Sequence, residues 1–206
     1  MMRNVFPLWR LALFLFVLLA SPARAEEGLL PDALVRNVSE EVLETLRQKK
    51  GGAREIIALV QEKVLPHFDF RHMTQLAVGR DWRKATPEQQ NALTKQFRDL
   101  LVRTYVNAVS VYSGQKMTYK PLKIAPGDTR VLVRTEVSQS GGTPIPVDYG
   151  MEKTGQGWKV YDVAVGGVSL IINYRDSFAQ EIHAGGIDGL IASLSAKNRE
   201  LAAKNK

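Results

Sequence analysis

The sequence predicts an α+β fold in which a four-stranded antiparallel sheet is covered by N-terminal and C-terminal helices. The prediction rests on the spacing of hydrophobic residues, which is helical in the first half of the chain, alternates over residues 116–165, and becomes helical again at the end. Short turns separate the alternating segments, which favours antiparallel neighbours. One face of such a sheet is apolar, and the flanking helices would cover it.

Four helical segments are expected before the strands. The first, residues 31–50, has a hydrophobic residue at every fourth position and ends at two glycines. The second covers residues 53–68, with Pro66 in its last turn, and a short third covers residues 70–79. The longest begins at Thr86, because threonine followed by Pro87 and Gln89 is the sequence of a capping box.

Four strands are expected next, at residues 116–124, at 130–138, around 145–151 and at 158–165. Pro121 marks an edge or a bulge in the first, because proline has no N–H for the ladder. In the other three, alternation places on one face Val131, Val133, Thr135 and Val137, then Ile145, Val147, Tyr149 and Met151, then Tyr161, Val163 and Val165. After the strands, Ser169 is expected to cap a helix that ends at Gly185 and Gly186, and residues 187–203 form the last helix.

Residues 1–25 are expected to form a secretory signal peptide. Arg3 and Arg10 precede the apolar run LALFLFVLLA at residues 11–20. Ala23 and Ala25 then give a small-x-small cleavage pattern. The run is too short to span a bilayer, which takes about 20 apolar residues. We therefore expect a single exported domain, residues 26–206.

Composition excludes several classes of protein. The 206 residues include no cysteine, so a disulfide scaffold, a zinc finger, an iron–sulfur cluster and a cysteine nucleophile are excluded. Three of the positive charges behind the net charge of +7 are arginines of the predicted signal peptide, so the net charge of residues 26–206 is smaller. The sequence has no basic stripe that would indicate a nucleic-acid partner.

Side chains that could carry chemistry are few. Asp69 and His72 could share a helix face, but no HExxH, GxSxG, GxGxxG or P-loop pattern occurs in the chain. We interpret His72 as a helix-surface residue and predict no metal, cofactor or catalytic site.

Tyrosines close to the predicted apolar faces leave two interpretations open. Tyr105, Tyr149 and Tyr174 are either ordinary core residues or part of a hollow between the sheet and the helices. Large apolar pockets with few polar groups are how small-molecule sites are usually built. A pocket without a base, a metal or a nucleophile would indicate binding and not turnover.

Several segments, taken in order, resemble the MlaC/Ttg2D family, the phospholipid-binding component of the Mla (toluene-tolerance) lipid transport system. Each segment alone is weakly specific, but their order and spacing cover most of residues 34–194. They are VLPHFDFR at 64–71, LAVG at 76–79, TPEQ at 86–89, GWKVYDV at 157–163, GVSL at 167–170, NYRDSF at 173–178 and GIDGL at 186–190.

The resemblance implies a soluble periplasmic carrier of a Gram-negative bacterium, without cofactor or catalysis. Such proteins hold the acyl chains of a diacyl phospholipid in an apolar pocket between a curved sheet and helices. They exchange lipid with an outer-membrane lipoprotein–porin complex and an inner-membrane ABC transporter with an MCE-domain ring, which maintains outer-membrane lipid asymmetry with only transient membrane contact. Gly166 stands where the family commonly has an acidic residue, which leaves partner or headgroup contacts there open.

The predicted faces and the resemblance together suggest ten residues that line the lipid pocket and pack against the tails: Leu101, Tyr105, Val133, Thr135, Val147, Tyr149, Val163, Val165, Ile171 and Tyr174. Three alternatives remain open. The ligand could be a hopanoid, since some relatives sit in hopanoid gene clusters, or a small apolar solute bound for an ABC importer. The protein could also be an enzyme on a similar fold that uses Asp162, Tyr161 or His72, which would need a polar group with a shifted pKa deep in the pocket.

Overall fold

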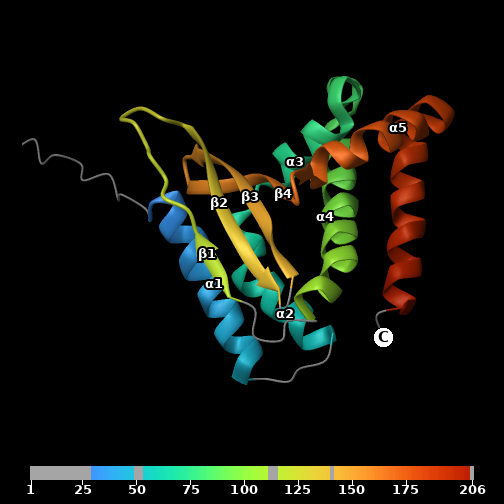
Figure 1. Ribbon diagram of the computed structural model, residues 1–206. Helices are drawn as coiled ribbons and strands as arrows, with labels where there is room; N and C mark the ends of the chain where they lie inside the picture. The colour runs from blue at the N-terminus through green and yellow to red at the C-terminus, as the bar shows by residue number, and fades with distance from the viewer. Residues whose placement is uncertain (1–28, 49–52, 111–115, 140–141, 205–206) are drawn as a thin grey trace, which may run out of the picture.

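The computed structural model describes residues 29–48, 53–110, 116–139 and 142–204, so the predicted signal peptide lies outside the described residues. Helices α1 and α2 come first, followed by a short 3₁₀ helix, helix α3, a second 3₁₀ helix and the long helix α4 (Figure 1). Strands β1 to β5 follow, and helix α5 ends the chain. The helical bounds are α1 Pro31–Gln48, α2 Ala53–Lys63, η1 Leu65–His67, α3 Phe70–Val78, η2 Gly79–Lys84, α4 Pro87–Ser110 and α5 Leu170–Lys204.

The strands form one antiparallel sheet in the order β1-β2-β3-β4-β5. The predicted α+β class is confirmed, with one strand more than expected, because two residues after the Gly166–Gly167 turn pair back onto β4. The first strand is shorter than predicted and ends two residues before Pro121. The bounds are β1 Met117–Tyr119, β2 Arg130–Gln139, β3 Gly142–Thr154, β4 Gly157–Val165 and β5 Val168–Ser169.

Local signals at the helix ends explain where the helices begin. The Thr86 N–H donates to Gln89 Oε1 at 3.0 Å, and the Gln89 N–H donates to Thr86 Oγ1 at 3.2 Å, which is the predicted capping box. Ser169 Oγ accepts from the Ile172 N–H at 3.0 Å, as expected of a cap. Helix α2 ends earlier than predicted, at Lys63, and the chain continues as η1 around Pro66.

The C-terminal helix bends where the sequence predicts a break. Gly186 has φ 68°, ψ −172°, so α5 is two helical segments joined at a kink. A positive φ of this kind favours glycine, which has no Cβ. Figure 1 shows the second segment running beside α4 on the side away from the sheet.

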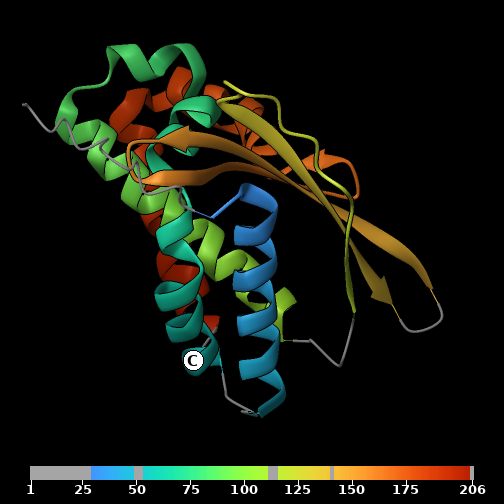
Figure 2. The ribbon, with the colours of Figure 1, turned by 90° about the vertical axis from the view of Figure 1, so that its left-hand side faces the viewer.

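The sheet has an inner and an outer face. On the inner face Val133, Met151 and Val160 pack with Val35 of α1, and Figure 2 shows the strands curving past this helix. The outer face carries Leu132, which is exposed.

One residue of β4 does not follow the predicted alternation. Gly150 pairs with Asp162, but the next residue, Met151, pairs with Val160, which leaves Tyr161 unpaired in a β-bulge. The expectation that Tyr161 shares a face with Val163 and Val165 is therefore wrong. Its ring lies on the outer face, beside Gly150.

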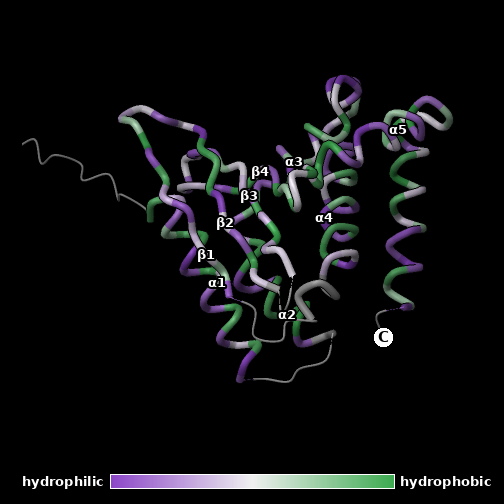
Figure 3. The backbone as a smooth tube through the Cα atoms, in the orientation of Figure 1, coloured by the Kyte–Doolittle hydropathy of each residue, from purple (hydrophilic) through white to green (hydrophobic). Residues whose placement is uncertain are grey.

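Buried apolar residues form two clusters. The helical cluster joins α3, η2, α4 and α5 around Phe97, and the sheet cluster joins the inner face to α1 around Met151. Phe68 packs against both. Among the described helices none is long and apolar enough to cross a bilayer, and Figure 3 shows hydrophilic residues recurring along each of them.

Candidate functional site

The inner face of the sheet brings six of the ten predicted pocket residues together. Strand pairing places Val133, Tyr149 and Val163 side by side in one cross-strand row. The next row holds Thr135, Val147 and Val165. Residues in such rows share a face and lie about 5 Å apart, so the two rows make a continuous surface on β2, β3 and β4.

The other four predicted residues belong to the helical cluster. Leu101 and Ile171 are buried in it, and Tyr105 and Tyr174 pack against it. The Tyr174 ring meets the Phe97 ring edge-on, with centroids 5.1 Å apart. The ten residues thus divide between a sheet wall and a helical wall and do not form one cluster.

The two walls meet at two places. Leu170 packs against the sheet cluster, whereas its neighbour Ile171 is buried in the helical cluster. Phe68 makes the second junction, and its backbone pairs with Val160 of β4. Phe68, Val160 and Leu170 were not among the predicted residues, although each lies within a segment that carries the family resemblance.

Burial decreases from one row to the next along β3 and β4, whereas Val133 and Thr135 on β2 are both 1% exposed. Met151 is 0% exposed, in a row with Val131 and Val160, whereas Val165 is 40% exposed. Tyr149 and Val147 are half-buried. Apolar side chains that remain accessible beside a closed cluster are what an apolar ligand requires.

The two rows of the sheet wall contain few polar side-chain atoms. Thr135 Oγ1 donates to the Val147 carbonyl at 2.8 Å. Burial raises the pKa of Tyr149 to about 12, and nearby Tyr119 adds to the rise. Burial likewise raises the pKa of Tyr174 to about 12. Both hydroxyls are therefore neutral at physiological pH, and neither is prepared to act as a base.

The raised pKa of Tyr149 predicts a loss of stability at alkaline pH. The stabilising effect of the neutral phenol is complete below the unfolded value near 10 and is lost as the pH rises to about 12. The loss is on the order of 2 kcal/mol. Urea unfolding over this pH range should show a steeper decline for the native protein than for Tyr149→Phe, and parallel profiles would contradict the prediction.

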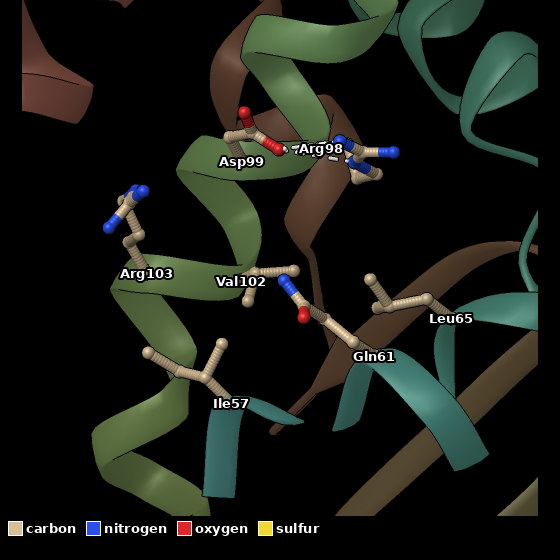
Figure 4. A pocket seen from close by; sticks show the side chains of 7 residues that line it. All are labelled: Ile57, Gln61, Leu65, Arg98, Asp99, Val102 and Arg103. Carbon is tan, nitrogen blue, oxygen red and sulfur yellow. Dashed lines mark hydrogen bonds and ion pairs between the residues drawn. The ribbon is translucent and has the colours of Figure 1, made fainter. Parts of the chain in front are cut away.

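A groove between α2 and α4 is a separate feature (Figure 4). Its volume is about 200 Å³, and none of the ten predicted residues lines it. Arg98 and Asp99 pair on its rim, with the Arg98 guanidinium 2.9 Å from Asp99 Oδ1. A pocket for two acyl chains needs up to about 1,000 Å³, so this groove is too small to hold them. The lining residues are Ile57, Gln61, Leu65, Arg98, Asp99, Val102 and Arg103.

The three residues considered for an enzyme lie away from the sheet wall. His72 stacks on Tyr161 on the outer face, with ring centroids 5.1 Å apart. Asp162 pairs with Gly150, which places its side chain on the same outer face, where Asp162 Oδ2 accepts from Ser169 Oγ at 2.7 Å. These groups therefore do not provide the polar centre deep in an apolar pocket that the enzyme alternative needs.

Comparison with known proteins identifies the family. The family model described as MlaC protein matches residues 36–196. The chain belongs to the MlaC family. Toluene tolerance protein ttg2D of Pseudomonas putida is 37% identical over 106 residues, which are 52% of this chain and 49% of that protein. The intermembrane phospholipid transport system binding protein MlaC of Haemophilus influenzae is 25% identical over 139 residues, which are 66% of this chain and 65% of that protein.

A solved structure is also similar to this chain. It is the phospholipid-binding protein from Ralstonia solanacearum in complex with a phospholipid, 39% identical, with a TM-score of 0.76. The match covers 83% of this chain and 98% of that one. The chain spans half to two thirds of the two curated relatives, but nearly all of the solved one. None of these descriptions names a catalytic activity.

Proposed function

We propose that this MlaC-family protein binds a diacyl phospholipid between the sheet wall and the helical wall and carries it across the periplasm. The observation that carries the proposal is the likeness to the Ralstonia protein, which holds a phospholipid and matches this chain over 98% of its length. The two rows on the inner face support the same function, because Val147, Tyr149 and Val165 remain partly accessible next to a closed core.

The energetics of lipid transfer explain why a carrier needs these walls. Each buried CH₂ contributes about 0.8 kcal/mol, so two chains of about 15 carbons would cost about 24 kcal/mol to expose to water. Free lipid in solution is therefore negligible, and a carrier must enclose both tails. Side chains without charge suffice for this task, and exchange needs no energy source when a partner offers a similar apolar surface.

The ten residues divide the work according to their place. The two rows of the sheet wall would contact the tails from the sheet: Val133, Tyr149 and Val163 in one row, and Thr135, Val147 and Val165 in the other. Leu101, Tyr105, Ile171 and Tyr174 would contact them from the helices. The 40% exposure of Val165 suits a position at the open end of the sheet wall.

The partners follow from the same proposal. Lipid would be exchanged with an outer-membrane lipoprotein–porin complex and with an inner-membrane ABC transporter that carries MCE domains. A signal peptide at residues 1–25 would deliver the protein to the periplasm. The protein itself would touch a membrane only briefly and would catalyse no reaction.

Native mass spectrometry tests the proposal directly. The protein is purified from a periplasmic extract without detergent, and the bound lipid is extracted and identified. A bound mass that matches a two-tailed phospholipid is the expected result. A bound mass that matches a hopanoid or a small apolar compound would change the identity of the ligand but would still show a binding protein. An empty protein that also takes up no phospholipid from vesicles would overturn the proposal.

A further inference from the structure

The β-bulge at Tyr161 divides the inner face of the sheet. On one side of the bulge lie Met151 and Val160, which pair with each other and are buried. On the other side lie Tyr149 and Val163, which begin the rows predicted to contact lipid. An extra residue in one strand bends that strand and increases the local twist. The sheet therefore changes direction between Met151, which is fully buried, and Tyr149, which is half-buried, although Val163 beyond the bulge still belongs to the sheet cluster.

A cluster of side chains on the outer face surrounds the extra residue. The His72 ring stacks on the Tyr161 ring at 5.1 Å with an interplanar angle of 28°. The Arg130 guanidinium carbon lies 5.7 Å from the centroid of the same ring. Glu152 joins the two, because its carboxylate contacts His72 Nδ1 and lies 3.5 Å from the Arg130 guanidinium. Tyr161 is thus held by residues of β2, β3 and α3.

Glycine at position 150 lets this ring lie close to the strand. A Cβ built on Gly150 would lie 3.2 Å from the Tyr161 ring, which is tighter than ordinary van der Waals contact. Gly150 is also the last residue that pairs before the register shifts. An alanine here would require the Tyr161 ring to move by a few tenths of an ångström.

Helix α3 is attached to the sheet at the same point. The Asp69 N–H donates to the Val160 carbonyl at 2.9 Å, and Asp69 Oδ1 accepts from the His72 N–H at 2.8 Å. Met73 and Ala77, farther along α3, are buried in the helical cluster. The outer-face cluster therefore connects the bend of the sheet to the helical wall.

From this geometry we infer that the outer-face cluster sets the angle between the two parts of the sheet and so determines which acyl chain lengths fit. The cluster consists of Gly150, His72, Glu152, Arg130 and Tyr161. The inference rests on the proposed function. These are positioning residues, because they lie on the outer face and act on the lipid through the inner rows. Met151 and Val160 would form the closed end of the acyl pocket, at a depth fixed by the bulge.

The test compares chain-length preference in Gly150→Ala, Tyr161→Ala and Tyr161→Phe. Delipidated mature protein is offered dilauroyl, dimyristoyl, dipalmitoyl and distearoyl phosphatidylcholine in competition, and native mass spectrometry gives the relative occupancy. Each methylene that no longer fits costs about 0.8 kcal/mol, which is roughly a fourfold loss of relative affinity. We expect Gly150→Ala and Tyr161→Ala to shift the preferred length and Tyr161→Phe, which keeps the ring, to retain the native profile.

The outcomes separate this inference from the proposed function. An unchanged length profile in both alanine variants, together with a lower melting temperature, would show a purely structural cluster and would overturn the inference. A shift in Tyr161→Phe equal to that in Tyr161→Ala would also overturn it, because the ring would then not be the cause. Failure of the native protein itself to bind any of the four lipids would instead overturn the proposed function.

Discussion

Replacing Val147 with arginine is expected to abolish phospholipid retention while leaving the protein folded. Val147 is half-buried on the inner face, between Thr135 and Val165 in its cross-strand row. The arginine could extend toward the accessible side in the empty protein, but bound tails would surround its charge. An uncompensated charge in an apolar site costs several kcal/mol, and even about 3 kcal/mol weakens binding by more than a hundredfold.

Leu132→Arg is the matched control. Leu132 lies on β2, 41% exposed on the outer face, so arginine there meets water and no lipid. Both variants are loaded from phospholipid vesicles, and the retained lipid is measured after gel filtration, with circular dichroism as the check on folding. Equal retention in the two variants would show that the inner face does not contact the tails. Val133 is a poorer site for this test, because at 1% exposure an arginine would also disrupt the sheet cluster.

Much of the fold could be predicted because it depends on local patterns. The capping box at Thr86 formed as predicted, since all its atoms lie within four consecutive residues. The alternation in β2 correctly places Val133 and Thr135 on the buried face. Such patterns need no knowledge of distant residues.

The bulge could not be predicted in the same way. Strict alternation places Tyr161 with Val163, but the register shift moves its ring to the outer face, against His72 from a helix 89 positions earlier in the chain (161 − 72). The glycine at position 150 was the one local signal, because a glycine inside a strand often marks a bulge or a close approach. Its partner across the sheet becomes known only when the register is known.

The candidate site was predictable as two sets of residues but not as a pocket. Alternation and helical spacing selected side chains that the structure places on a sheet wall and on a helical wall. Periodicity does not distinguish a hollow from a packed core, because both need apolar side chains at the same positions. Phe68 and Leu170, which join the walls, lie outside regular strands or at a helix end, where periodicity carries little information.

Replacing Phe97 with alanine is expected to cause a large loss in the free energy of unfolding. Phe97 is 0% exposed at the centre of the helical cluster. Its ring meets Tyr174 and Phe178 edge-on, each at 5.1 Å between centroids. Removing a fully buried phenylalanine costs about 4 kcal/mol through lost burial and the cavity left behind. For a protein of this size the melting temperature should fall by roughly 12 °C.

Phe97→Leu separates loss of volume from loss of the aromatic contacts. Leucine fills most of the space, so a cost of about 1 kcal/mol is expected from the remaining mismatch. Urea unfolding followed by circular dichroism gives both values, and a loss below 1 kcal/mol in Phe97→Ala would mean that the cluster closes around the gap. Because Phe97 supports Tyr174 on the helical wall, Phe97→Ala should also loosen lipid retention, whereas Phe97→Leu should retain it. A variant that is destabilised but keeps native retention would show that Tyr174 does not depend on Phe97 for its position against the lipid.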